Sequence, residues 1–233
     1  EYQSQEWCPL VSLRRRLANG AAMNLEAAIL ARTTKRAKLV LLGNPLPIFD
    51  NPLRLAEELA ENDMISRGRL VSGFVRGTGI ESWATNTNPA YNRERFQEAH
   101  DLIIKTWTTP GPFRWEGKYY NFRGVNPWML PLQNPHPPIW IGGHTGPAIR
   151  RAAELGDGWM PIGLRPPAIL EPEELAGKIA RLRTLTVQAG RPEDAVSVCF
   201  STDVLFQDTP SLDRRMMSGR PEQIAADLRQ YQD

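Results

Sequence analysis

Apolar residues occur along the chain in two alternating patterns, continuous runs and helical spacing. Short continuous apolar runs at 38–42, 70–75 and 139–141 end in glycine or proline or close to them, which is typical of parallel strands that are covered on both faces. Apolar residues at helical spacing over 23–32, 51–60, 93–107 and 173–189 predict amphipathic helices. Because the two kinds of segment alternate, the pattern predicts an α/β fold with a parallel sheet.

The remaining elements are predicted with less regular patterns. We expect a helix at 147–154, a strand at 158–161, a strand at 196–206 and a last helix that begins at Arg220. Residues 80–91 lack periodicity and are interpreted as a loop, and the sequence Gly43-Asn44-Pro45 is expected to stop the first strand. The stretch 108–137 is long and irregular, with a small hairpin expected at 113–120. We interpret it as an insertion at the active-site face of a single domain that spans residues 1–233, because loops of this length are usually functional or flexible.

The composition narrows the class of protein. Hydrophobic residues make up 41% and charged residues 23%, as in globular domains, and the net charge of only +2 argues against a nucleic-acid partner. No apolar run reaches the roughly 18 residues that a membrane span needs, and the polar start does not resemble a signal peptide. Cys8 and Cys199 lie far apart, which favours two free thiols in a reducing cytoplasm.

Glycine-rich loops follow several of the predicted strands, namely Gly43-Asn44, Arg76-Gly77, residues 142–145 and residues 161–163. Parallel α/β folds bind ligands at the carboxyl ends of their strands. Because these loops follow several different strands, they favour a (β/α) barrel over an open sheet with one ligand-binding crevice.

Two of these loops could bind a phosphate group. The glycines at 142–143 precede a helix, whose unpaired N–H groups and dipole attract anions, although a glycine pair alone is more often a turn. Arg76 directly follows a buried strand, where a guanidinium could reach a phosphate or could form a structural salt bridge; from the residue alone the two readings are even. Gly77-Thr78-Gly79 lacks the third glycine of a dinucleotide fingerprint, so we expect no nicotinamide site.

The polar residues supply no reaction chemistry of their own. The three histidines, His100, His136 and His144, have no metal-ligand spacing and form no catalytic set, and neither cysteine has a local histidine partner. We therefore favour an organic cofactor as the group that carries the reaction chemistry. Several tryptophans could line a pocket for a flat ring, whereas Trp107 and Trp140 are expected in the core.

Six short motifs occur in an order that identifies a family. They are PLRLAEE at 52–58, SRGR at 66–69, GFVRG at 73–77, RFQEA at 95–99, PPIWIGG at 137–143 and AAELGDGW at 152–159. Together they closely resemble the bacterial-luciferase-like flavin monooxygenases over about residues 24–233.

This resemblance implies a (β/α)8 TIM-type barrel, usually dimeric, that binds reduced FMN or the deazaflavin F420 at its carboxyl-terminal mouth. It implies that Arg76 binds the flavin phosphate with contacts from Gly143, His144 and Thr145. Gly43 and Asn44 would lie against the ring, where relatives often hold a strained or cis peptide, and Trp159 would border the pocket. Val75 stands where luciferase itself carries a cysteine.

The chain departs from the family pattern in two respects. Relatives often carry Glu-His-His at the end of the second strand, whereas this chain begins Glu1-Tyr2-Gln3, which leaves Tyr2 as a weak catalytic candidate. The first unit of the barrel and the last βα unit have no counterpart. A barrel with missing strands would expose unpaired edges, so we expect a piece of a longer chain rather than a degenerate barrel sealed by a partner.

The expected activity follows from the resemblance. It implies an FMN-dependent monooxygenase that uses O2 to oxygenate a small aldehyde- or ketone-like substrate, with reduced flavin supplied by a separate reductase. Two alternatives stay open, an F420-dependent hydride-transfer oxidoreductase on the same fold and a non-catalytic flavin-binding relative. The histidine spacings lead us to expect no metal site.

Overall fold

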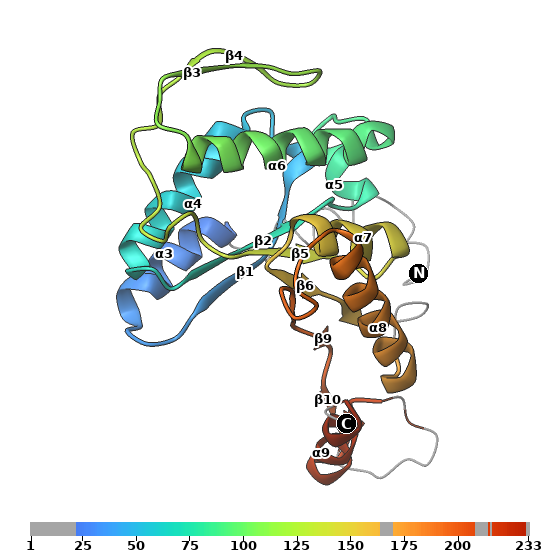
Figure 1. Cartoon of the computed structure of the whole chain (residues 1–233). Helices are drawn as coiled ribbons and strands as arrows, with labels where there is room; N and C mark the ends of the chain where they lie inside the picture. The colour runs from blue at the N-terminus through green and yellow to red at the C-terminus, as the bar shows by residue number, and fades with distance from the viewer. Residues whose placement is uncertain (1–21, 164–169, 208–213, 215, 232–233) are drawn as a thin grey trace, which may run out of the picture. The chain divides into compact units, whose positions relative to one another are not determined.

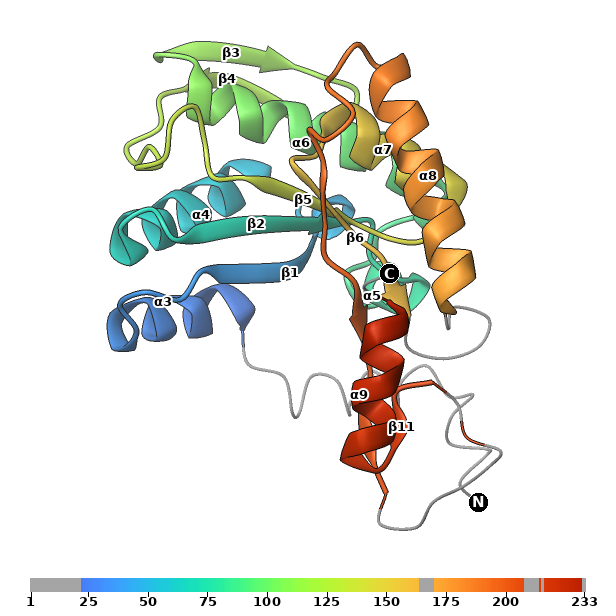
Figure 2. The same cartoon turned by 60° about the horizontal axis from the view of Figure 1, so that its bottom comes forward.

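The computed structural model describes residues 22–163, 170–207, 214 and 216–231 (Figures 1 and 2). The chain divides into two compact units, Glu1–Ile139 and Trp140–Asp233. Tyr2 and Cys8 lie outside the described residues. Within the described ranges, no helix is both long enough and apolar enough to cross a membrane.

The first unit places helices against a pair of parallel strands. Its elements are α3 (Met23–Thr33), β1 (Leu39–Pro45), η1 (Leu46–Ile48), α4 (Pro52–Ser66), β2 (Leu70–Val75), α5 (Gly79–Ala84), η2 (Pro89–Tyr91), α6 (Asn92–Thr108), β3 (Phe113–Glu116) and β4 (Asn121–Val125). β1 pairs with β2 in parallel, from Leu39 opposite Leu70 onward. The core contains fully buried side chains from α4, β2 and α6, among them Leu55, Phe74 and Phe96. The strands and helices predicted around residues 38, 51, 70 and 93 are therefore confirmed.

Two sequence predictions in this unit are wrong. β1 does not stop at Gly43 but continues to Pro45, because Gly43 adopts a positive φ of 116° that lets the strand bulge and carry on. Residues 80–91 are not a loop throughout, since they contain most of α5 and all of η2. α5 starts with a capping box in which Thr78 and Glu81 satisfy each other's backbone N–H groups.

A hairpin of β3 and β4 lies along α6 on the side away from β1 and β2 (Figure 1). Its tip is held by two carboxylates one helical turn apart. Glu98 accepts hydrogen bonds from the Trp115 indole and from the N–H groups of Tyr119 and Tyr120, at 2.9–3.3 Å. Glu94 accepts from the Lys118 ammonium and from the Tyr119 hydroxyl, at 2.6 and 2.8 Å. The expected hairpin is confirmed, with a second strand that runs on to Val125.

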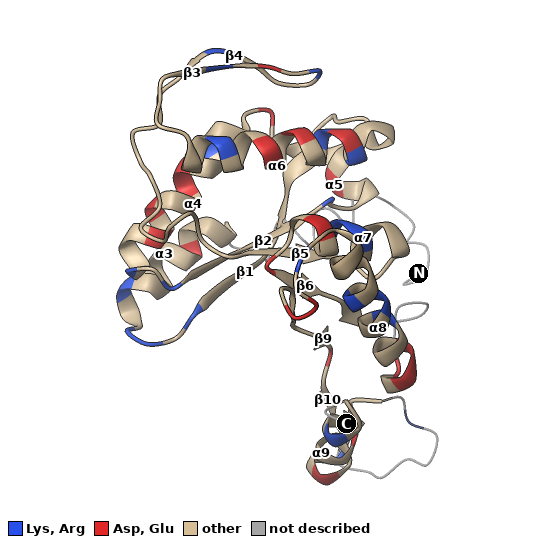
Figure 3. Ribbon diagram, in the orientation of Figure 1, with Lys and Arg blue, Asp and Glu red and all other residues tan. Residues whose placement is uncertain are grey.

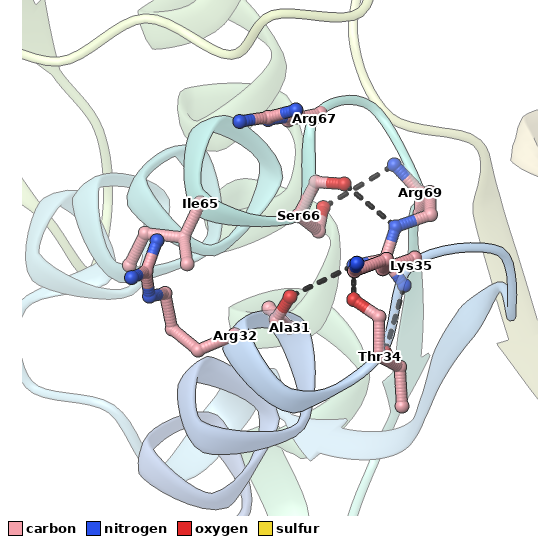
Figure 4. A pocket seen from close by; sticks show the side chains of 8 residues that line it. All are labelled: Ala31, Arg32, Thr34, Lys35, Ile65, Ser66, Arg67 and Arg69. Carbon is pink, nitrogen blue, oxygen red and sulfur yellow. Dashed lines mark hydrogen bonds between the residues drawn. The ribbon is translucent and has the colours of Figure 1, made fainter.

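Arg69 joins the ends of α3 and α4 (Figure 4). Its Nε donates to the Ser66 carbonyl, and its two terminal nitrogens donate to the carbonyls of Ala31, Thr34 and Ala37 and to the Thr34 hydroxyl. A guanidinium has five N–H donors, so every donor of this side chain is used. The charge also lies at the negative ends of two helix dipoles, where a cation is stabilising.

The second unit starts within a strand and continues as a parallel α/β arrangement. Its elements are β5 (Ile139–Gly142, whose first residue belongs to the first unit), α7 (Gly146–Leu155), β6 (Gly158–Met160), β7 (Ile162–Gly163), α8 (Pro172–Gln188), β8 (Ser197–Val198), β9 (Ser201–Thr202), β10 (Leu205–Phe206), β11 (Ser218–Gly219) and α9 (Pro221–Gln230). β6 pairs in parallel with β5 and β8, and α7 packs against α8. The single strand predicted at 196–206 is wrong, because these residues form three short strands.

Two details of the second unit correct or complete the sequence reading. Trp140 is half-buried rather than a core residue, and its indole covers Gly158, where a Cβ would lie 2.4 Å from the ring. Near the end of the chain, the Arg214 guanidinium binds both carboxylate oxygens of Asp227, at 2.5 and 2.7 Å. Asp227 is fully buried and also accepts the Met217 N–H, so this ion pair fixes α9 to the segment before it.

Candidate functional site

A bulge at the end of β1 positions the first two predicted site residues. Leu41 pairs with Ser72 and Asn44 with Phe74, so Leu42 and Gly43 together stand opposite one residue of β2. An extra residue exchanges the faces of the residues that follow it, and here it leaves Asn44 only 2% exposed. The Asn44 Nδ2 is buried and has no hydrogen-bond acceptor among the described residues. A buried donor of this kind is costly unless a bound molecule accepts its hydrogen bond.

Arg76 lies one residue beyond β2 and is exposed. No hydrogen bond or ion pair joins its side chain to another described residue of the first unit, so the structural salt bridge considered from the sequence is not observed there. Gly77 follows with a φ of 74°, and a Cβ on it would lie 3.0 Å from the Pro45 Cβ. The ends of β1 and β2 therefore meet closely, which places Arg76 near the strand end that carries Gly43 and Asn44.

The predicted glycine turn after β5 is present, and a hydrogen bond from Trp159 stabilises it. The Gly143 N–H donates to the Met160 carbonyl at 3.1 Å, and the Gly143 carbonyl accepts from the Trp159 indole at 2.7 Å. Gly143 has a φ of 125°, and a Cβ would meet that of Ala148 at 2.9 Å, so the turn requires glycine. Trp159 is fully buried, so its ring supports the turn.

The residues after this turn present unpaired backbone donors. His144 is half-buried and Thr145 is exposed, and Thr145 precedes α7 without a capping hydrogen bond from its side chain. The N–H groups of His144 and Thr145 have no acceptor among the described residues, and the first N–H of α7, on Gly146, has none within its helix. The first turn of α7 contains no acidic residue. Donors at the positive end of a ten-residue helix favour an anion.

Arg181 on α8 is a residue that the sequence reasoning missed. Its guanidinium nitrogens and carbon lie 3.3–3.5 Å from the position that a Cβ would take on Gly146. A cation at the positive end of a helix is unfavourable unless an anion lies beside the cation and the helix N-terminus. Arg181 follows Gly146 by 35 positions and belongs to no local motif, so only the packing of α7 on α8 reveals it.

The other residues singled out from the sequence are scattered. The described residues contain no group of three metal-ligating side chains. His100 is buried against Phe74 and Phe96, and Cys199 is a free thiol. Trp128 is 94% exposed in the loop after the hairpin.

The comparison with protein families decides the class of this chain. Residues 20–233 match the family described as luciferase-like monooxygenase. The chain belongs to the luciferase-like monooxygenase family.

Individual members and structures agree with this assignment. The oxygenase component of a flavin-dependent trigonelline monooxygenase from Acinetobacter baylyi is 32% identical over 127 residues, which are 50% of this chain and 32% of that protein. The crystal structure of the monooxygenase RslO1 from Streptomyces bottropensis is 28% identical, with a TM-score of 0.67 over 79% of this chain and 55% of that one. The coenzyme F420-dependent tetrahydromethanopterin reductase from Methanopyrus kandleri shows the same fold at 19% identity, with a TM-score of 0.64 over 82% of this chain and 56% of that one.

The family and the fold class predicted from the sequence are thus confirmed. The solved relatives of this luciferase-like chain are TIM barrels, and the described residues form an α/β arrangement with parallel strands. The chain spans 55% of the Streptomyces monooxygenase, and its alignment with the Acinetobacter protein spans a third of that relative.

Proposed function

We propose that this protein is a flavin-dependent monooxygenase that uses reduced FMN and O2 to oxygenate a small aldehyde- or ketone-like substrate. The observation that carries the proposal is the family match over residues 20–233. The Acinetobacter relative, at 32% identity, is named a flavin-dependent monooxygenase, which supports both the cofactor class and the reaction type.

The residues at the end of β1 fit a flavin ring. The unpaired Nδ2 of the buried Asn44 can donate to a ring carbonyl or ring nitrogen, and such a bond would remove the cost of the orphaned donor. Gly43 leaves no side chain at the bulge beside Asn44, and its peptide bond to Asn44 is trans. FMN, when bound, supplies the oxygen chemistry, and the part of these residues is to hold and orient the ring.

Each unit by itself offers donors for a phosphate. In the first unit, the Arg76 guanidinium has no partner among the described residues of that unit, and a guanidinium can bind a phosphate with two parallel hydrogen bonds. In the second unit, the N–H groups of His144 and Thr145 have no acceptor among the described residues, and the N–H of Gly146 begins α7, so these groups are candidate donors. The Arg181 guanidinium lies beside Gly146 as a cation. Gly143 contributes by shaping the turn, since its own N–H is already bonded to Met160.

Reaction with a substrate panel tests the proposal. The protein is mixed with photoreduced FMN, O2 and a set of aldehydes and ketones, and oxygenated products are detected by mass spectrometry against a reaction without protein. Products with one added oxygen atom are expected. FMN binding without any product across the panel would instead support a flavin-binding protein, and would contradict the monooxygenase proposal.

An F420-dependent hydride transfer is the second candidate. The likeness in fold to an F420-dependent reductase, with a TM-score of 0.64, favours keeping it. Titration of the protein with FMN and F420, followed by fluorescence, separates the two. Tight binding of F420 with weak binding of FMN would overturn the first proposal.

The partners are part of the same proposal. The name of the Acinetobacter relative, an oxygenase component, supports a separate reductase as the source of reduced flavin. Dimerisation, which the resemblance implies, and a cytoplasmic location, which the two separate cysteines favour, stay predictions. Analytical ultracentrifugation measures the first of them directly.

A further inference from the structure

We propose that the first unit carries a second ligand site, for a small anion with a diphosphate or triphosphate group, in a basic hollow between the C-terminal ends of α3 and α4 (Figure 4). The hollow has a volume of about 650 Å³. It is lined by Ala31, Arg32, Thr34, Lys35, Ile65, Ser66, Arg67 and Arg69. Half of these residues are cationic and none is acidic.

Arg69, one of the four cationic residues, is already fully hydrogen-bonded within the protein. Arg69 donates all five of its N–H groups to Ser66, Ala31, Thr34 and Ala37, which fixes the side chain against the ends of both helices. Figure 4 shows the bonds from Arg69 to Ser66, Ala31 and Thr34 as dashed lines at one side of the hollow. Arg69 is therefore part of the wall of the site and not a free ligand group.

The other three cations are free to bind. Arg32 is in the last turn of α3, Lys35 follows that helix, and Arg67 is the residue after α4. All three are exposed, and none makes a hydrogen bond or ion pair with another residue of the described part of the first unit. Like charges around one hollow repel one another. An anion bound between them would attract all three and offset that repulsion.

The helix dipoles oppose an anion here, but they are too weak to prevent binding. Each helix C-terminus carries about half a negative elementary charge. Two such ends are offset by the full charge of Arg69, which bonds to their carbonyl groups. The three free cations then give the hollow a net positive charge. Figure 3 shows basic residues along the end of α3 and the segment that leads to β1.

Size and shape favour a small molecule over a macromolecule. A volume of about 650 Å³ equals roughly twenty water molecules at about 30 Å³ each, which is enough for a molecule of nucleotide size. Guanidinium groups bind phosphate oxygens in pairs, whereas an ammonium acts as a point charge, so Arg32 and Arg67 with Lys35 suit neighbouring phosphates. Acidic proteins and nucleic acids need contact surfaces of about 600 Å² or more per partner, and the cations gather around one hollow instead.

Titration with inorganic pyrophosphate tests the site. Backbone amide resonances of the isotope-labelled chain are followed at constant ionic strength, and saturable shifts are expected at residues 31–35 and 65–69. The triple variant R32Q/K35Q/R67Q should bind pyrophosphate at least tenfold more weakly. The control R93Q/R123Q/R229Q removes the same charge from exposed residues elsewhere and should change the affinity less than twofold.

Three results would overturn the proposal: no saturable shifts at these residues, shifts confined to residues 76–78 and 143–146, or equal weakening in the two triple variants. The second result would locate pyrophosphate at the residues assigned to the flavin phosphate. Arg69 is unchanged in both variants, so a correctly folded first unit is expected, and the dispersion of the amide spectrum checks it. Failure here leaves the proposed FMN chemistry untouched, because that is measured by product formation.

Discussion

Replacing Arg69 by alanine is expected to lower the free energy of unfolding of the first unit by about 2.5–5 kcal/mol. The side chain makes five hydrogen bonds of 2.6–3.0 Å, to Ser66, Ala31, Ala37 and twice to Thr34. A net value of about 0.5–1.5 kcal/mol for each bond gives a range of about 2.5–7.5 kcal/mol. Because Arg69 is only partly buried, water can reach some of the released carbonyls, so the lower half of the range applies. Such a loss is a large fraction of a typical domain stability of about 5–15 kcal/mol.

Urea unfolding followed by circular dichroism, together with amide exchange at Leu39, measures the effect. The Leu39 N–H donates to the Arg69 backbone carbonyl, so it reports on this region and is retained in the variant. Arg67→Ala is the matched control, because it removes a neighbouring cation without a side-chain bond, and it should change stability by less than about 0.5 kcal/mol. Arg69→Lys, with three donors instead of five, should fall between. An Arg69→Ala loss below 1 kcal/mol, or no larger than that of the control, would refute the argument.

Three further outcomes follow from the contacts described. Arg76→Ala should weaken FMN binding by about 1.5–3 kcal/mol, roughly ten- to over a hundredfold, as measured by fluorescence titration; unchanged affinity would exclude Arg76 from the phosphate site. Gly143→Ala should destabilise the second unit by about 1–3 kcal/mol in thermal unfolding, because of its positive φ and the short contact to Ala148, and a neutral result would contradict the strained turn. The hydrogen bonds from Arg214 hold the pKa of Asp227 below its ordinary value of 3.8. Its stabilisation is therefore complete above about pH 4 and lost as the pH falls through the lowered pKa, so the stability difference between wild type and Asp227→Asn should shrink below pH 4 and stay constant from pH 5 to 7.

The sequence predicts elements well where the signal is local and periodic. α4 begins where Asn51 and Pro52 predict it, because the Asn51 side chain accepts the Leu53 N–H and proline suits the first turn. α5 was missed although its cap residues, Thr78 and Glu81, have the spacing of a capping box, because six residues are too few for a hydrophobic period. The bulge in β1 was missed for another reason: glycine can end a strand or bend it, and only pairing with β2 decides between the two.

The candidate site residues at the ends of strands could be named from the sequence, whereas the one on a neighbouring helix could not. Asn44 lies at the end of one strand, Arg76 and His144 follow two others, and neighbouring glycines mark all three in the sequence. Arg181 lies on a helix surface like many other arginines, and its position beside Gly146 arises from the packing of α7 and α8. A charged residue that approaches a site from a neighbouring helix has no signature in a single sequence.

The hairpin of β3 and β4 has a consequence for engineering. In most hairpins the tip is the part that tolerates insertions, but here Trp115, Lys118, Tyr119 and Tyr120 are bound to two carboxylates of α6. A peptide tag inserted at this tip would therefore cut the attachment of the whole hairpin. The loop after β4, where Trp128 is almost wholly exposed, offers a place for a fluorescent label or a tether that leaves those bonds intact.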